Sequence, residues 1–365
     1  MKLCGCNNSY KFGGCLNNYN DDTNNIKFPG QSGLDVSSLL SFSSYVSSVW
    51  INQNYEAFAV GNNEFGQINS ALPKEILEID TKINFRYKNG QPCKFISAVG
   101  GRNYTLFQIS GETSSDPSLL ALAYAVRKTI FLNIGKRSPL SLFGGVTVSA
   151  AIDTDGSVII ITESVYDSPE SEIEIAKLPP GEKAVKAACG KKSVIVLCES
   201  CRVFECSLTS KTNNNTFSEV KELAGKKINE ISGTCDHFFA ISEDCQVFGR
   251  GDNEGCKLGL PSDIEEVEEF TLIESLSKYH VIEASAGTVD SLFRTREGQI
   301  LGCGWNDSGE LMLKSGNKEE VYPPEETKVT SGATFCISGA GSSVVFVGVE
   351  PPPNSPNMKI RGAVH

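Results

Sequence analysis

The chain has 365 residues, of which 21% are charged and 40% are hydrophobic, an ordinary composition for a globular protein. Its formal net charge is −11 and its lysines and arginines are scattered, which argues against direct nucleic-acid binding, because phosphate contacts need concentrated positive charge. The longest apolar runs, such as 157–161 and 193–197, have the length of one strand, whereas a membrane span needs roughly 20 apolar residues. The first residues lack the apolar core of a signal peptide, so we expect a cytoplasmic, or else nuclear, location.

A β-prone run followed by the pattern G-x-N occurs four times, beginning near residues 3, 58, 247 and 300. In two copies a further glycine follows three residues after the asparagine. Glycine allows a sharp turn at the end of a strand, and the asparagine side chain is expected to hydrogen-bond the backbone of its own turn. We therefore assign a structural role to Gly5, Asn7, Gly61, Asn63, Gly66, Gly251, Asn253, Gly304, Asn306 and Gly309.

A second pattern lies between these copies and consists of a small-residue turn, a β-branched or aromatic strand and an acidic turn. Its copies occupy residues 144–156, 189–201, 233–245 and 286–298, with a looser copy at 100–107. Asp155-Gly156 and Glu297-Gly298 supply the positive φ that a tight hairpin turn requires. The nearly continuous apolar strands indicate burial on both faces.

The spacing of these turns predicts the number of repeats. Gly5 and Gly61 are 56 residues apart, and the turns at Gly156, Cys201, Cys245 and Gly298 follow at intervals of 45, 44 and 53 residues. A period of about 40–55 residues with four short strands per unit is typical of a β-propeller. We predict an all-β, seven-bladed propeller of four-stranded antiparallel blades over residues 1–349. The predicted blades lie near 3–52, 55–109, 118–152, 157–197, 202–241, 246–293 and 299–347, and the proline-rich segment 350–365 is predicted to be a flexible tail.

The combined pattern, V-[FY]-x-x-G-x-N-x-x-G-[QE]-L with its strand-and-acidic-turn partner, resembles the RCC1 repeat. Segments 61–67, 251–253 and 304–306 match it specifically, whereas the third to fifth units are degenerate. The resemblance implies a seven-bladed ring with loops on two faces and a structural role for His237. Photoreceptors of this class depend on a dense tryptophan cluster, and the chain has only Trp50 and Trp305.

Two acidic loops follow the G-x-N motif in neighbouring repeats. They contain Asp263, Glu265, Glu266, Glu268, Glu269, Glu319, Glu320, Glu325 and Glu326. We expect these side chains to form one acidic patch that receives a basic protein partner. The competing interpretation is that the charged loops only keep the ring in solution.

The chain has no G-x-S-x-G, P-loop or H-E-x-x-H motif and only three histidines, which disfavours an enzyme. Cys198 and Cys201 form a C-x-x-C pair, but no second pair completes a zinc site, so we expect buried thiols and neither metal nor cofactor. The function predicted from sequence is a monomeric, non-catalytic protein-interaction platform. The alternative implied by the resemblance is a guanine-nucleotide exchange factor for a small Ran- or Rho-like GTPase.

Overall fold

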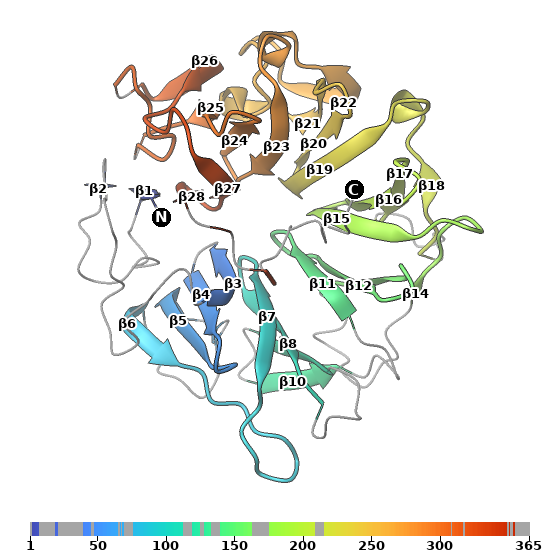
Figure 1. Ribbon diagram of the computed structural model, residues 1–365, viewed down its shortest axis with the longest axis vertical. Helices are drawn as coiled ribbons and strands as arrows, with labels where there is room; N and C mark the ends of the chain where they lie inside the picture. The colour runs from blue at the N-terminus through green and yellow to red at the C-terminus, as the bar shows by residue number, and fades with distance from the viewer. Residues whose placement is uncertain are drawn as a thin grey trace.

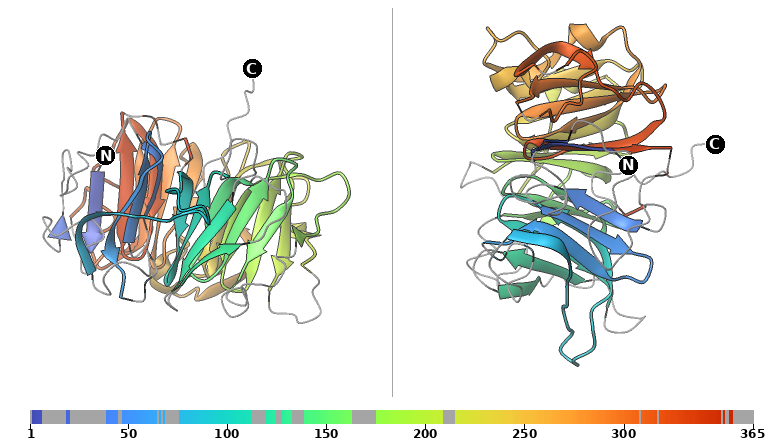
Figure 2. Two further views of the ribbon diagram at one scale, coloured as in Figure 1. Left: turned by 90° about the horizontal axis from the view of Figure 1, so that it is seen from below. Right: turned by 90° about the vertical axis from the view of Figure 1, so that its left-hand side faces the viewer.

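The computed structural model describes residues 2–6, 19–20, 39–44, 47–64, 66, 68, 76–111, 119–124, 128–132, 139–162, 175–208, 215–307, 309–316, 318–348, 350 and 353–354. Within these ranges the regular structure consists of β-strands and three short 3₁₀ turns, so the predicted all-β class is confirmed. The sheets are arranged around a common centre (Figure 1), with their strands stacked side by side around the ring (Figure 2). No helix in the described part of the chain is long and apolar enough to cross a membrane.

Each sheet runs from an inner strand at the centre to an outer strand at the rim (Figure 1). The first three sheets contain β3 (Leu39–Ser44), β4 (Ser47–Asn52), β5 (Ala57–Asn62) and β6 (Ile76–Lys82); β7 (Phe95–Gly100), β8 (Tyr104–Ile109), β9 (Leu119–Tyr124) and β10 (Lys128–Leu132); and β11 (Pro139–Gly144), β12 (Ser149–Asp153), β13 (Val158–Ile161) and β14 (Ile175–Ala176).

An eight-stranded sheet follows, in two antiparallel halves. They contain β15 (Ala184–Gly190), β16 (Ser193–Cys198), β17 (Val203–Ser207) and β18 (Ser218–Glu219), and β19 (Ile228–Cys235), β20 (His237–Ser242), β21 (Val247–Asp252) and β22 (Glu266–Leu272). The halves meet through a short parallel pairing of β15 with β19, at Cys189 with Thr234 and Gly190 with Cys235. The 3₁₀ turns η2 (Lys221–Leu223), η3 (Glu254–Cys256) and η4 (Glu274–Leu276) lie in connections between strands of this region.

The last two sheets complete the ring. One contains β23 (Val281–Ala286), β24 (Asp290–Thr295), β25 (Ile300–Trp305) and β26 (Glu320–Glu326). The other joins both ends of the chain, because β27 (Ala333–Ser338) and β28 (Ser342–Val347) pair with β1 (Lys2–Cys6) and β2 (Tyr19–Asn20). The register of β1 on β28 runs from Lys2 opposite Val345 to Gly5 opposite Ser342.

The sheet boundaries differ from the predicted blade boundaries. The predicted unit 3–52 contributes β1 and β2 to one sheet and β3 and β4 to another. Counted from the inner strand, each G-x-N motif begins on the third strand of its sheet. A unit that is counted from one motif to the next therefore starts in the middle of one sheet and ends in the middle of the following one. The pairing of β1 with β28 also joins the two ends of the chain within one sheet.

Of the predicted flexible tail, residues 350 and 353–354 lie within the described part. The Asn354 side chain donates a hydrogen bond to the carbonyl oxygen of Ile96 in β7, at 3.3 Å.

The G-x-N motifs form the expected turns. Their asparagines are buried, and each Oδ1 accepts a hydrogen bond at 2.8–3.0 Å from the backbone N–H five residues further along the chain. The pairs are Asn63–Ile68, Asn253–Leu258 and Asn306–Leu311. Gly61, Gly251 and Gly304 have φ values of 107°, 110° and 108°. Gly5 lies in β1, whereas Asn7 falls outside the described residues.

The Asn306→Asp variant should lower the free energy of unfolding by about 2–4 kcal/mol. The Asn306 amide also donates to the Lys318 carbonyl at 3.0 Å, and aspartate would lose that donor while placing a charge at a site only 1% exposed. Urea unfolding measures the change. Asn89→Asp is the control, because exposed Asn89 accepts the Gln91 N–H at 2.9 Å, and aspartate keeps that role. Equal effects of the two substitutions would contradict the prediction.

Buried charges connect the inner strands of the second half of the ring. Lys186 in β15 pairs with Glu230 in β19, and both side chains are largely buried. In the next sheet, Arg294 donates to Glu283 at 2.5 Å. Glu283 also accepts the backbone N–H of Cys336 in β27 at 3.4 Å, so this series of polar contacts extends to the sheet that closes the ring.

Candidate protein-binding surface

The two acidic loops occupy equivalent positions in neighbouring sheets. Glu266 in β22 lies opposite Asp252, and Glu320 in β26 lies opposite Trp305. The carbonyl oxygen of the preceding glutamate, 265 or 319, accepts the N–H of the motif asparagine at 2.8 Å in both sheets. The same turn geometry therefore presents both acidic loops, and Figure 1 shows β22 and β26 on the same side of the ring.

The loops also touch one another across the boundary between the two sheets. The Cys256 thiol, in η3, donates to the Glu320 carboxylate at 3.2 Å. Trp305 packs directly on Gly255, where an added Cβ would lie 1.8 Å from the indole nitrogen. Burial and the Glu320 carboxylate raise the pKa of the Cys256 thiol to about 12, so it stays protonated and remains a donor.

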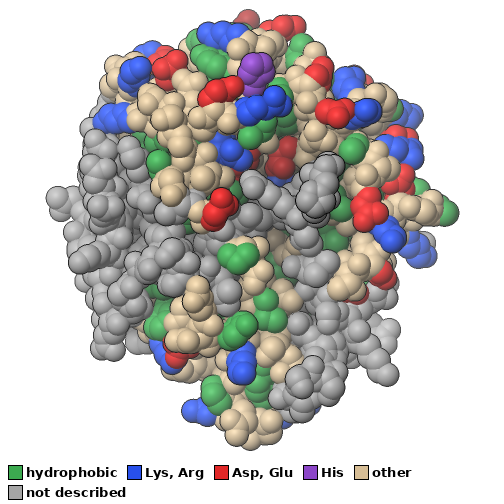
Figure 3. Space-filling model, in the orientation of Figure 1, with side chains coloured by type: hydrophobic (Ala, Val, Ile, Leu, Met, Phe, Trp, Pro, Cys, Tyr) green, Lys and Arg blue, Asp and Glu red, His purple; other side chains and the backbone are tan. Residues whose placement is uncertain are grey.

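Seven of the nine predicted acidic residues are exposed, and we call them the acidic surface: Asp263, Glu265, Glu266, Glu268, Glu269, Glu319 and Glu320. The other two, Glu325 and Glu326, are half-buried and pair with Lys318 and Lys314 respectively. Burial alone would raise the pKa of Glu325, but hydrogen bonds from Lys318 and Ser315 hold it below its usual value. Acidic side chains appear at the upper edge of the molecule in Figure 3.

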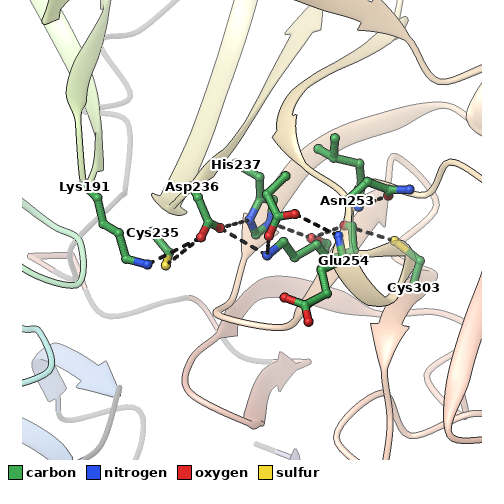
Figure 4. Close-up of polar contacts among 11 residues, drawn as sticks. Lys191, Cys235, Asp236, His237, Asn253, Glu254 and Cys303 are labelled. Atoms are coloured by element: carbon green, nitrogen blue, oxygen red, sulfur yellow. Dashed lines mark hydrogen bonds and ion pairs between the residues drawn. The ribbon is translucent and has the colours of Figure 1, made fainter. Parts of the chain in front are cut away.

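A second polar cluster lies at the turn between β19 and β20 (Figure 4). Asp236 accepts hydrogen bonds from Lys257 at 3.1 Å and from the Cys235 thiol at 3.3 Å, and it lies 3.5 Å from Lys191. Lys257 also pairs with Asp252. Burial by itself would raise the pKa of Asp236, but the Lys257 ammonium group and the Cys235 thiol hold that pKa well below the usual range. The sequence did not point to this cluster, because its members come from three separate segments, around 191, 235–237 and 252–257.

His237 is fully buried within this cluster and links two sheets. Ser291 in β24 donates its only hydroxyl proton to the carbonyl of Lys257 at 2.7 Å, so Nε2 of His237 must donate to the Ser291 oxygen at 3.1 Å. Nδ1 then carries no proton and lies 3.9 Å from Asp236, and within the described part of the chain it has no hydrogen-bond partner. Burial lowers the pKa of His237 and favours this neutral form. The geometry supports the structural role implied by the repeat resemblance.

The C-x-x-C pair has two distinct environments. Cys198 is buried in the core, and burial raises the pKa of its thiol to about 12. Cys201 adopts φ 61° in the hairpin turn, and its N–H donates to the Cys198 carbonyl at 2.9 Å. Among the described residues, no three histidine, cysteine, aspartate or glutamate side chains are grouped to hold a metal ion.

Comparison with known proteins shows partial matches in sequence and a broad match in fold. No protein-family profile matches the chain. Human protein RCC2 is 32% identical over 126 residues, which cover 32% of this chain and 24% of RCC2. The bovine secretion-regulating guanine nucleotide exchange factor is 27% identical over 126 residues, covering 33% of this chain and 27% of that protein.

The solved structure of human WBSCR16 superposes with a TM-score of 0.69 and 12% identity, covering 95% of this chain and 98% of WBSCR16. Prp20p from Saccharomyces cerevisiae, described with its binding to Gsp1p and histones, gives a TM-score of 0.68 and 13% identity, covering 94% and 90% of the two chains. The chain has the fold of an RCC1-like β-propeller. It matches 24% and 27% of the length of the two curated relatives named above.

Proposed function

We propose that the chain is a protein-interaction platform without chemistry of its own, built as one ring of seven four-stranded blades over residues 1–349. The sheet order supports seven units, because five sheets have four strands and the eight-stranded sheet divides into two four-stranded halves. Those halves share only two residue pairs, at the inner ends of β15 and β19.

The acidic surface is the proposed binding site, and its partner would be a basic protein segment. The proposal rests on seven exposed carboxylates on two adjacent sheets. Asp263, Glu265 and Glu319 lie in the loops that follow buried Asn253 and Asn306, and the other four lie in the outer strands β22 and β26. Ordered backbones keep these charges close together before a partner arrives. Such a field attracts a cationic segment and speeds its encounter with the surface.

Charge reversal tests this site. The variant with Glu265, Glu266, Glu268 and Glu269 replaced by lysine should capture at least about tenfold less basic partner from the native cell, since attraction becomes repulsion. The matched control replaces four other exposed acids, Glu199, Glu243, Glu274 and Glu297, by lysine and changes the net charge equally. Capture that is unchanged in the first variant, or equally reduced in both, would refute the proposed site.

Guanine-nucleotide exchange is the second candidate, favoured by the name of the bovine relative. Release of labelled nucleotide from Ran-like and Rho-like GTPases, with and without the chain, separates the two candidates. Acceleration well above the background rate would replace the non-catalytic proposal with the exchange-factor one.

A further inference from the structure

A hairpin between β6 and β7 extends beyond the sheets at the rim of the ring. It comprises residues 83–94 and is seen at the bottom of Figure 1 and of the right-hand view in Figure 2. Arg86 and Pro92 form an antiparallel bridge, and the Tyr87 N–H donates to the Gln91 carbonyl at 2.9 Å. The tip is the turn from Tyr87 to Gly90, closed by a 2.9 Å hydrogen bond from the Gly90 N–H to the Tyr87 carbonyl.

One face of this hairpin is anchored in the hydrophobic core. Ile83, Phe85, Tyr87 and Cys93 are each at most 8% exposed. The Phe85 ring packs edge-on against Phe107 with centroids 5.3 Å apart, and the Tyr87 hydroxyl donates to the Ser110 carbonyl at 2.8 Å. These contacts hold the hairpin in a fixed position on the hydrophobic core.

The other face is positively charged. Residues 83–94 contain three basic side chains, Arg86, Lys88 and Lys94, and no acidic one, in a chain of net charge −11. All three are exposed, and within the described part of the chain neither Arg86 nor Lys94 forms an ion pair. Arg86 also donates to the Gly90 carbonyl at 2.7 Å, which holds its guanidinium beside the tip. Figure 3 shows Lys and Arg side chains along the lower rim with little acidic colour beside them.

We propose that this basic hairpin docks an acidic peptide segment of a partner protein. Three cations on a narrow, ordered hairpin match a short run of carboxylates in charge. The hairpin loses little conformational entropy on binding, because its buried face already holds it in place. A nucleic acid or an anionic membrane needs a broader basic surface, and the acidic remainder of the chain repels both. This surface is separate from the acidic surface and opposite in charge, so it adds a second binding element to the ring.

The test uses the full chain and a fluorescein-labelled peptide of ten glutamates, followed by fluorescence anisotropy at about 50 mM salt, where screening is weak. The wild type should bind, and the variant Arg86→Glu, Lys88→Glu, Lys94→Glu should bind about tenfold more weakly. The control reverses three other exposed lysines, Lys183, Lys192 and Lys221, with the same change of net charge, and should stay within about twofold of the wild type. The charge-conserving variant Arg86→Lys, Lys88→Arg, Lys94→Arg should retain binding.

Four results would overturn the proposal: no peptide binding by the wild type, no loss in the reversal variant, equal loss in the control, or tighter binding of duplex DNA or anionic vesicles than of the peptide. Concentration-dependent self-association that the reversal abolishes would also overturn it, since the occupant would be a second copy of this chain. If the triple reversal unfolds the protein, the double variant Lys88→Glu, Lys94→Glu replaces it, with an expected loss of about fivefold. Because the probe is acidic, failure here leaves the test of the acidic surface unaffected.

Discussion

Replacing Gly304 with alanine should lower the free energy of unfolding by at least about 3 kcal/mol, because a conformational cost and a steric cost add. Gly304 adopts φ 108°, which side chains disfavour. A Cβ there would lie 2.6 Å from both Asp290 Cα and the Val289 carbonyl oxygen. These atoms are backbone, so β24 and β25 would have to separate. Urea unfolding of the full chain measures the change.

Gly309→Ala is the matched control, in the same loop five residues further on. Gly309 also has positive φ, 71°, but an added Cβ would meet nothing within 4 Å. Its substitution should therefore cost only about 1 kcal/mol, the conformational part alone. Equal losses from the two alanines would show that the close approach of β24 and β25 contributes nothing.

The Glu230→Gln variant should lower the free energy of unfolding by about 3–5 kcal/mol. The substitution keeps the shape of the side chain but removes the charge that faces Lys186. Lys186 is only 4% exposed, so its ammonium group would be left buried without a counter-charge. Equilibrium unfolding in urea gives the size of the loss.

The comparison is Glu243→Gln, which breaks the pair with Lys227 at 3.2 Å, where both side chains are more than half exposed. Solvent screens that pair, so its loss should cost less than about 1 kcal/mol. Replacing Lys186 with methionine and Glu230 with leucine together should restore most of the stability, because neither charge then needs solvation. A Glu230→Gln loss as small as that of Glu243→Gln would mean that water reaches the Lys186 site.

Much of the local structure could be predicted from sequence. The apolar runs became strands, and Asn63, Asn253 and Asn306 bond the backbone of their own turns, as the G-x-N pattern predicted. Both features depend on residues within a few positions of each other, so the pattern carries them directly. The acidic loops were also found by composition alone, although pairing with Lys314 and Lys318 removes Glu326 and Glu325 from the free surface.

The basic hairpin and the buried charges were missed for different reasons. In the hairpin, apolar residues at 83, 85, 87 and 93 alternate with exposed ones. This alternation predicts strands, but it does not show that the segment, which lies within the predicted unit 55–109, extends beyond the sheets. Lys186 and Glu230 are 44 residues apart and carry no motif. A buried ion pair such as this one forms only when the fold brings two charges together and excludes water, which no local pattern records.

By itself the sequence determined the β-class, the repeat, the turns that end the third strands and the acidic loops, because each follows from neighbouring residues. Only the tertiary structure decided which strands share a sheet, that β1 closes the ring on β28, and which charges are paired or exposed. Hydrogen bonding between strands and the burial of charge depend on distance in space, not on distance along the chain. Lys186 and Glu230 are about 45 residues apart in sequence, and the paired strands β1 and β28 lie at opposite ends of the chain.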